Sequence, residues 1–555
     1  MKKKTTSLGM KLVAFLAMLM LFCIPVSAGV KETAGEYEIY PTPQEITYGD
    51  KEMQLTDHTL NVLKLTGNES AASDKTELIV GVYGSGDAAD TYGKANGAVQ
   101  ATFDNYDAYM LYVKDGKIVV LGKDTDAAFY GVTTLKRIFE QLSADKKIKE
   151  LTVTDYAEVQ FRGFIEGYYG NPWSLEDRID LMKFGGEIKM NQYVFAPKDD
   201  PYHNSQWREL YPTENLENIK KLAQAGNENK CFFVYALHPF MNSPFNFNNY
   251  NADLATVKAK YLQVIESGVR QIALLEDDAT GSSAANLSRL LNDLTNWLTE
   301  LKNSKYPDLK TDILYCPTDY MGNGSSAKLK GINASANRQV HMLMTGNAVW
   351  GQVSANFADN FYNNVASNGV AGRYPYMWVN WPCNDNYKTG LIMGGHNTIL
   401  HTGIDGHKYE GIILNPMQHS EPSKVAIFTA ADYCWKPWDA KEEGDQAWED
   451  SFKYIDHVTA LESDSSKALR EVAKHMIYQG PVQTAGRQAK FEESVDLKNK
   501  LAEIQKKVEA GTVTTAELDD MRNEFKTIYD AAVKYLTDGT NKRLSEQMTP
   551  FLACL

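Results

Sequence analysis

Short apolar segments alternate with amphipathic stretches over residues 156–438, and this alternation is the clearest pattern in the chain. Ser174, with Asp177 three residues later, forms a capping box that predicts the start of a first helix. Eight apolar segments are expected to be strands: Phe161–Tyr168, Gln192–Ala196, Phe232–Ala236, Gln271–Leu275, Asp312–Cys316, His341–Met344, Tyr376–Asn380 and Gly411–Leu414. Eight strands with intervening helices predict an α/β fold of the (β/α)8 barrel type. A doubly wound open sheet gives a similar alternation, but the Gly-rich first turn that usually accompanies it is not found in the sequence.

The residues before the barrel, 37–155, predict an α+β domain. Asp115 and Gly116 separate two apolar strands, Ala108–Val113 and Lys117–Gly122, and both residue types tolerate the positive φ that a tight hairpin requires. Thr125–Leu142 is amphipathic at helical spacing. No chemistry is concentrated here, so a supporting role is expected.

The residues after the barrel, 439–555, predict a helical domain. Phe491–Ala510 and Ala516–Leu536 are long, charged and amphipathic, and Gly511 breaks the pattern between them. Thr514 and Glu517 form a second capping box. These signals indicate a pair of helices joined as a hairpin, or a small helical bundle.

The first 28 residues have the composition of a cleavable signal peptide. Four lysines precede an apolar run from Leu12 to Pro25. Val26-Ser27-Ala28 then supplies the small residues of a cleavage site. The run of ~14 residues is shorter than the ~20 that a spanning helix needs. We therefore expect cleavage after Ala28, export from the cell, and no membrane insertion.

Charge and cysteine usage narrow the possible partners. The chain carries 57 basic and 71 acidic residues, a net charge of −14, and loss of the four leader lysines lowers this to −18. An acidic surface argues against nucleic acid and anionic membranes as partners. Five cysteines remain after the leader, without a C-x-x-C motif, so buried free thiols are expected and no metal or cofactor is predicted. They are Cys231, Cys316, Cys383, Cys434 and Cys554.

Polar and aromatic residues follow the C-terminal ends of the predicted barrel strands, where barrel enzymes carry their active sites. Asp277 and Asp278 follow the apolar run QIALL. Like charges so close together do not both ionise easily, so one carboxyl is expected to keep its proton near neutrality. Such a pair can divide the work of a general acid from electrostatic support. The same dipeptide occurs at Asp199-Asp200 and Asp519-Asp520, and only the position at a strand end singles out the pair at 277.

Six motifs, in order, resemble those of the family 84 glycoside hydrolases, the β-N-acetylglucosaminidases that include bacterial glycan-processing enzymes and animal O-GlcNAcases. They are FRGFIEGYYGNPWS, NQYVFAPKDDPYHNSQWRELYP, QIALLEDDA, CPTDY, WVNWPCND and ILNPMQHSE. The resemblance covers about residues 37–440 and extends to the helices after them. It implies release of terminal β-linked N-acetylglucosamine from glycans or glycoproteins by a retaining mechanism. In that mechanism the substrate's own 2-acetamido oxygen is the nucleophile and an oxazoline forms.

The resemblance also implies roles for single residues. Asp277 would polarise the acetamido group, and Asp278 would act first as general acid and then as base. Tyr320 would orient the acetamido carbonyl. Gly167 and Lys198 would contact sugar hydroxyls, and Asp385 and Asn415 would hold the hydroxyls at the far side of the sugar. Trp378 and Asn380 would shape the pocket around the N-acetyl group. Glu276 is expected to be structural or to face the rim.

Other interpretations stay open at this point. An endo-acting, hyaluronidase-like hexosaminidase would have an open cleft instead of a closed pocket. A non-catalytic glycan-binding protein would lack one carboxylate of the pair, and this sequence keeps both. The third predicted strand ends in ALHPFMN, where animal members have a serine-proline-glycine ending, so contacts near the leaving group are less defined. The natural aglycone also remains open among mucin, other host glycans, cell-wall fragments and O-GlcNAc protein.

Overall fold

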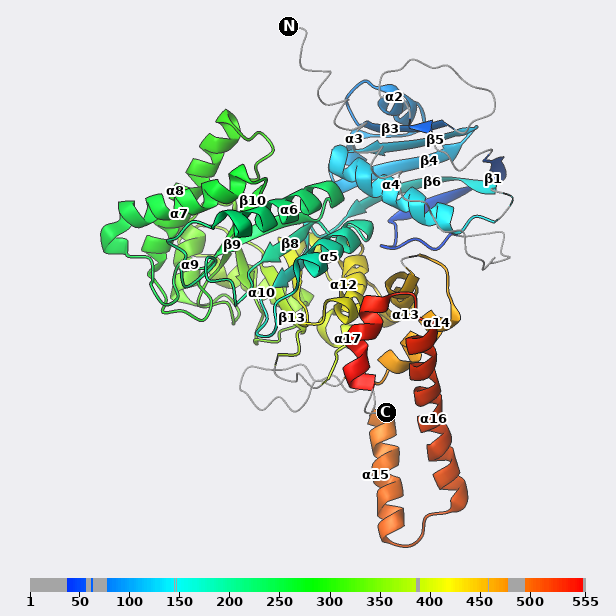
Figure 1. Ribbon diagram of the computed structural model, residues 1–555. Helices are drawn as coiled ribbons and strands as arrows, with labels where there is room; N and C mark the ends of the chain where they lie inside the picture. The colour runs from blue at the N-terminus through cyan, green and yellow to red at the C-terminus, as the bar shows by residue number, and fades with distance from the viewer. Residues whose placement is uncertain are drawn as a thin grey trace.

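The computed structural model describes residues 37–55, 61–62, 77–143, 145, 147–385, 390–457, 459–477 and 495–552. In chain order these residues form a six-stranded sheet with helices, a closed eight-stranded barrel and a group of helices (Figure 1). The predicted signal peptide and Cys554 lie outside the described residues. Among the helices that are described, none has the length and apolar character needed to cross a membrane.

The N-terminal sheet has the strand order β1-β6-β4-β5-β3-β2. Helix α4 covers one face through Phe129 and Leu135, and α2 and α3 cover the other face, where Ala89 and Phe103 are buried. Asp115 and Gly116 have φ of 51° and 77°, and the hairpin that they were expected to form joins β4 to β5. The elements are β1 (Glu45–Gln54), β2 (Asn61–Val62), β3 (Glu77–Val82), α2 (Ala88–Ala95), α3 (Gln100–Phe103), β4 (Tyr106–Lys114), β5 (Lys117–Gly122), α4 (Thr125–Glu140) and β6 (Lys147–Ala157).

Eight parallel strands close the barrel, as the sequence predicted, and each pairs with its neighbours in chain order. The strands are β7 (Phe161–Glu166), β8 (Gln192–Phe195), β9 (Phe232–Leu237), β10 (Gln271–Leu275), β11 (Ile313–Cys316), β12 (Val340–Met344), β13 (Tyr376–Pro382) and β14 (Gly411–Asn415). The first strand ends at Glu166, two residues earlier than predicted, so Gly167 to Tyr169 belong to the loop above the barrel.

Helices surround the barrel, and the first of them begins as the sequence indicated. Ser174 Oγ accepts a hydrogen bond from the amide of Asp177, and the Asp177 carboxylate accepts one from the amide of Ser174. The helices are α5 (Leu175–Glu187), α6 (Thr213–Asn229), η1 (Phe247–Asn249), α7 (Tyr250–Glu266), α8 (Ala284–Ser304), α9 (Ala327–Ser335), α10 (Ala355–Val365), α11 (His396–Ile399), η2 (Gly406–Lys408) and α12 (Ser420–Trp435).

A buried ion pair joins the N-terminal sheet to the barrel. Lys189, which precedes β8, places its Nζ 3.0 Å from Oδ2 of Asp155 on β6, and both side chains are fully buried. Trp435 at the end of α12 donates its Nε1–H to the other oxygen of Asp155 at 2.7 Å. Burial lowers the pKa of Lys189. The contact lies towards the N-terminal ends of the barrel strands, opposite the end that carries the predicted chemistry.

The last helices are α13 (Lys441–His457), α14 (Asp464–Ala473), α15 (Val495–Glu509), α16 (Thr515–Asp538) and α17 (Lys542–Leu552). Helices α15 and α16 form the expected hairpin, which projects from the rest of the molecule (Figure 1). The capping box of Thr514 and Glu517 opens α16, and the ion pair of Lys500 with Glu524 bridges the two helices. The predicted beginning of the first helix at Phe491 lies outside the described residues.

Candidate active site

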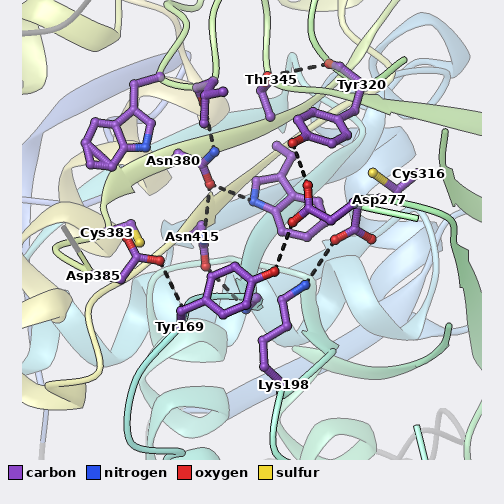
Figure 2. A pocket seen from close by; sticks show the side chains of 15 residues that line it. Tyr169, Lys198, Asp277, Cys316, Tyr320, Thr345, Asn380, Cys383, Asp385 and Asn415 are labelled. Carbon is purple, nitrogen blue, oxygen red and sulfur yellow. Dashed lines mark hydrogen bonds and ion pairs between the residues drawn. The ribbon is translucent and has the colours of Figure 1, made fainter. Parts of the chain in front are cut away.

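A cavity of about 440 Å³ lies at the C-terminal ends of the barrel strands (Figure 2). All nine residues singled out from the sequence line it: Gly167, Lys198, Asp277, Asp278, Tyr320, Trp378, Asn380, Asp385 and Asn415. Six further residues complete the lining: Tyr169, Cys316, Thr345, Val349, Trp350 and Cys383. The fold therefore brings loops from seven of the eight strands around one space. The roles that were assigned to the nine residues stay predictions.

Asp277 is buried, and its two carboxylate oxygens have different partners. Lys198 places its Nζ 3.0 Å from Oδ2. Oδ1 is buried and accepts no hydrogen bond within the described part of the chain. Burial alone would raise the pKa of Asp277, but the nearby Lys198 ammonium outweighs this effect, so the pKa is lowered. Asp277 is therefore an anion near neutrality at the wall of the cavity.

Asp278 is surrounded by hydroxyl groups instead of cations. Tyr320 donates its hydroxyl to Oδ1 at 2.8 Å, and Tyr169 donates its hydroxyl to Oδ2 at 2.9 Å (Figure 2). Burial and the neighbouring Asp278 raise the pKa of Tyr320, so its proton stays on the oxygen. The two adjacent aspartates thus have different electrostatic surroundings.

The backbone explains how two consecutive side chains reach one cavity. Neighbours along a strand point to opposite sides, but β10 ends at Leu275 and Asp278 has φ of 54°. This left-handed conformation costs most residues other than glycine about 1–2 kcal/mol, and aspartate is among those that adopt it more readily. It turns the chain so that both carboxylates line the same space.

His238 is a residue of this region that the sequence reasoning missed. It follows β9 directly, is fully buried, and donates Nε2–H to the backbone oxygen of Asp277 at 2.7 Å. The same nitrogen lies 3.5 Å from Oδ1 of Asp277. The sequence did contain a signal for His238, namely the ALHP ending of the third strand. That ending was interpreted as a difference from the animal family members and not as a contact with the aspartates.

An amide network shapes the opposite wall of the cavity. Asn380 Oδ1 accepts hydrogen bonds from Trp378 Nε1 and from Asn415 Nδ2, each at 2.9 Å. Asn415 Oδ1 in turn accepts from the amide of Gly167 at 3.2 Å. A Cβ at Gly167 would lie 2.4 Å from a ring carbon of Trp378, so only glycine fits at this position. The network holds the indole and both amides in one arrangement.

Asp385 and Tyr169 close the cavity on the remaining side. The amide of Tyr169 donates to Oδ2 of Asp385 at 3.0 Å, so the loop after β7 is tied to the loop after β13. The Tyr169 ring is half exposed, and Lys198 Nζ lies 5.2 Å from its centre. Tyr169 thus contacts Asp385, Lys198 and Asp278, all of which were predicted from the sequence to belong to the site.

Two other reactive groups nearby have structural explanations. Glu276 is fully buried, pairs with Lys328 at 2.7 Å and accepts the Tyr315 hydroxyl at 2.6 Å, in agreement with the structural role expected for it. Cys316 lines the cavity, but burial raises the pKa of its thiol well above the usual range. The described residues contain no group of three or more His, Cys, Asp or Glu side chains arranged to hold a metal ion.

Comparisons with known proteins match both the barrel and the sheet before it. A family model described as beta-N-acetylglucosaminidase matches residues 162–474, more than half of the chain. A second model, described as glycosyl hydrolase family 20, domain 2, matches residues 36–156. The chain is 30% identical to protein O-GlcNAcases of Rattus norvegicus and Mus musculus over 282 residues. That region is 49% of this chain and 29% of each relative, so the match spans less than a third of these curated relatives.

Solved structures extend the likeness to nearly the whole chain. The protein titled CpGH84D is 34% identical, with a TM-score of 0.81, and the match covers 93% of this chain and 87% of that one. CpGH84B is 26% identical, with a TM-score of 0.75 and coverage of 93% and 89%. An O-GlcNAc hydrolase of Thermobaculum terrenum, 21% identical over 71% of this chain and 81% of its own, has a TM-score of 0.55 and shares the fold.

Proposed function

Because the chain belongs to family 84 of the glycoside hydrolases, the β-N-acetylglucosaminidase family, we propose that it removes terminal β-linked N-acetylglucosamine by a retaining, substrate-assisted mechanism. The observation that carries the proposal is the state of Asp277. Its side chain lines the cavity as an anion, with Oδ2 held by Lys198 and a buried Oδ1 that accepts no hydrogen bond within the described residues and lies 3.5 Å from His238 Nε2. A carboxylate anion at the wall of the cavity suits an N–H of the substrate, and the acetamido group supplies one.

The first chemical step uses the two aspartates differently. Asp277 accepts the acetamido N–H, which makes the acetamido oxygen a better nucleophile towards the anomeric carbon. As that oxygen forms its bond to the carbon, the glycosidic bond breaks and Asp278 gives its proton to the leaving oxygen. The positive charge of the resulting oxazolinium lies beside the Asp277 carboxylate, and an anion placed in advance stabilises such a charge.

The second step reverses the proton transfer. Asp278, now a carboxylate, takes a proton from water while the water oxygen attacks the anomeric carbon and the oxazoline ring opens. The hydroxyls of Tyr169 and Tyr320 donate to Asp278 and stabilise this charged form. The product keeps the β configuration because two inversions have occurred.

Three described groups at the cavity are poor candidates for a nucleophile from the protein. The raised pKa of Cys316 keeps its sulfur protonated, and a thiol is a much weaker nucleophile than a thiolate. Asp277 is engaged with Lys198, and Asp278 is needed for proton transfer. A nucleophile that the substrate carries with it fits these constraints.

We propose exo-cleavage in preference to endo-cleavage. Asn415 is buried, and Asn380 and Trp378 lie behind it in the amide network, so the sugar's far hydroxyls would meet a wall at this end. Asp385 would bind the same hydroxyls from the adjacent loop. A continuing sugar chain would then be blocked at this wall. The partners of the protein are then glycans or glycoproteins that end in N-acetylglucosamine.

The central test compares an aryl β-N-acetylglucosaminide with the corresponding aryl β-glucoside. The two substrates differ in the internal nucleophile, so we expect a large preference for the N-acetyl substrate in kcat/KM. Comparable rates on both would contradict the substrate-assisted mechanism while leaving a glycosidase in place.

Asp278→Asn tests the general acid separately. In kcat/KM, which reports the steps up to departure of the leaving group, activity should be largely lost on glycosides with poor leaving groups and largely kept on those with good leaving groups, which need little protonation. Asp277→Asn should impair both kinds of substrate. Equal loss for both substrates in Asp278→Asn would contradict the acid role.

We also propose that the protein is exported after cleavage behind Ala28. The support is the lysine-rich start, the apolar run and the small residues at 26–28. Expression of the full chain with subsequent N-terminal sequencing should give Gly29 as the first residue of the secreted protein. Recovery of an uncleaved chain in the membrane fraction would contradict this.

A further inference from the structure

Glu276 is a third carboxylate beside the two aspartates, and it lies where β10 and β11 end. It is fully buried, and its amide donates to the backbone oxygen of Cys316 at 2.8 Å. Its Oε1 accepts a hydrogen bond from the amide of Ser282 at 2.7 Å. This second bond closes the segment between β10 and α8, which we call the aspartate loop (residues 276–282) because it carries both aspartates.

Lys328 carries the connection from Glu276 to a second loop. It lies in the first turn of α9, and its Nζ is 2.7 Å from Oε2 of Glu276 and 2.7 Å from Oγ1 of Thr318. Thr318 belongs to the segment between β11 and α9, which we call the tyrosine loop (residues 317–326) because it carries Tyr320. The side chains of Glu276, Lys328 and Thr318 thus join the aspartate loop to the tyrosine loop.

The two loops are packed closely at this link. A Cβ at Gly281 would lie 2.9 Å from Thr318 Oγ1 and 3.0 Å from Lys328 Nζ, so a larger residue there would press on both atoms. On its other side the tyrosine loop is held by Thr345, whose amide donates to the backbone oxygen of Tyr320 at 2.8 Å. The tyrosine loop is therefore held at two points, and the point at Thr318 fixes it relative to the aspartate loop.

The link lies beside the contact that the proposed chemistry uses. Tyr320 follows Thr318 by two residues, and Asp278 follows Glu276 by two residues. The Tyr320 hydroxyl donates to Asp278 Oδ1 at 2.8 Å (Figure 2). Asp278 itself is exposed, so packing restrains its side chain less than that of the buried Glu276.

We infer that Glu276, Lys328 and Thr318 are positioning residues, which set the hydrogen bond between Tyr320 and Asp278. This inference rests on the proposed function, in which Asp278 transfers the proton and the Tyr320 hydroxyl stabilises its charged form. A small displacement of groups that take part in a reaction can reduce the rate greatly, even when the cause lies outside the site.

Thr318 is the best position at which to test the link. Lys328 compensates the charge of the buried Glu276, and a buried carboxylate that loses its cation destabilises the fold. A change at Lys328 would therefore affect folding as well as position. Thr318 is only partly buried, and its substitution leaves the ion pair of Glu276 and Lys328 in place.

Thr318→Val removes the hydroxyl that Lys328 contacts and keeps the shape of the side chain. On an aryl β-N-acetylglucosaminide with a poor leaving group, we expect kcat to fall by about tenfold, with a smaller change in KM. Thr318→Ser keeps the hydroxyl and should keep most of the parent kcat. A parent-like kcat in Thr318→Val overturns the inference.

Thr311→Val is the matched control. Thr311 is buried just before the opposite end of β11, where its Oγ1 accepts a hydrogen bond from Gln339 Nε2 at 2.5 Å. This variant loses one hydroxyl contact far from the aspartates and should keep the parent kcat below its melting temperature. A loss in Thr311→Val or Thr318→Ser as large as the loss in Thr318→Val overturns the positioning role.

Tyr320→Phe shows whether the link acts through the Tyr320 hydroxyl. Phenylalanine has no hydroxyl to donate to Asp278, so Thr318→Val should cost little further kcat in that background. Substitutions that act through one contact are not additive, whereas independent effects add. The same fold-loss from Thr318→Val in both backgrounds therefore overturns the inference.

A crystal structure of Thr318→Val gives a readout that does not depend on activity. The Tyr320 hydroxyl should no longer lie within hydrogen-bond distance of Asp278 Oδ1, and retention of the 2.8 Å contact overturns the inference. The parent's own rate on the aryl substrate tests the proposed function separately. An inactive parent would refute that function, while the structure of the variant would still decide whether the link positions Tyr320.

Discussion

His238 is expected to hold the Asp277-Asp278 peptide in the conformation that the chemistry needs. Its Nε2–H donates to the backbone oxygen of Asp277 at 2.7 Å in a fully buried position. That oxygen belongs to the peptide that precedes Asp278, whose φ is 54°. His238→Ala removes the hydrogen bond without removing a side chain that lines the cavity.

Two energies of similar size oppose each other at this peptide. Leaving a buried carbonyl without its donor costs about 1–3 kcal/mol. The left-handed conformation of Asp278 costs about 1–2 kcal/mol, which is released when the peptide relaxes. Loss of the hydrogen bond therefore removes the energy that holds the strained conformation. At about 1.4 kcal/mol per factor of ten, we expect kcat to fall by about 10- to 100-fold.

His238→Gln is the variant that separates positioning from packing. Glutamine carries an N–H donor at a similar reach, so it should recover much of the lost kcat, whereas alanine should not. KM should change less than kcat in both variants, because the hydroxyl contacts of the sugar come from other loops. Steady-state kinetics with a good and a poor leaving group, together with melting temperatures, provides the measurement.

Either of two results would refute the positioning role of His238. In the first, His238→Ala lowers the melting temperature but keeps the parent kcat well below that temperature, so the histidine only packs. In the second, alanine and glutamine variants have equal kcat, so the donated hydrogen bond is not what matters.

Substitutions at three other positions test the site and the barrel. Gly167→Ala should reduce kcat/KM at least tenfold, since its Cβ would overlap the Trp378 ring. Gly170→Ala should be milder because its Cβ meets the acyclic side chain of Gln418, with Oε1 the nearest atom at 2.5 Å and Cβ at 3.2 Å. Equal losses in steady-state assays would contradict this. Lys198→Met should raise the pKa of Asp277 and move the acid limb of the kcat/KM profile to higher pH, and an unmoved limb would show that Lys198 does not set that pKa. Glu410 and Asp312, at 2.7 and 3.1 Å, overcome the effect of burial and raise the pKa of His341 from 6.5 to about 9. A raised pKa means that the protonated histidine stabilises the fold fully below pH 6.5 and loses this contribution as pH rises through 9, a difference of about 3 kcal/mol. Denaturant unfolding of parent and His341→Gln should therefore differ most at low pH and converge at high pH, and a constant difference would contradict the linkage.

The barrel strands were predictable because burial on both sides makes each of them a short apolar run. Gln271–Leu275 in the barrel has the predicted bounds, and so does Lys117–Gly122, a buried strand of the N-terminal sheet. β1 was missed for the opposite reason. Its sequence, EITYGDKEMQ, is mostly exposed, carries Gly and Asp in its middle, and is interrupted in register between Tyr48 and Glu52. A strand that is held mainly by hydrogen bonds to its neighbour needs no alternating hydrophobic pattern, so its own sequence does not predict it.

The sequence predicted which residues form the site, but it did not predict the hydrogen bonds that connect them. Nine residues could be named because parallel strands of a barrel end at one face, so polar side chains after each strand meet there. Their hydrogen bonds depend on loop conformations that no periodic pattern encodes. The positive φ of Asp278 is one example, since aspartate tolerates this conformation but is found far more often outside it. The contact of His238 with Asp277 is another, because the two residues are thirty-nine positions apart.

The connections also change the explanation of the paired aspartates. From the sequence, repulsion between neighbouring carboxylates was expected to separate their protonation states. In the structure the two differ in their partners: an ammonium lies against Asp277 and lowers its pKa, whereas two phenol hydroxyls donate to Asp278. Lys198 thus holds the anion, and in the proposed mechanism proton transfer falls to the residue that has no cation bonded to it. The proposed division of labour between two identical side chains then depends on residues of the loops after β7, β8 and β11, so the dipeptide alone, as at Asp519-Asp520, would not be expected to have it.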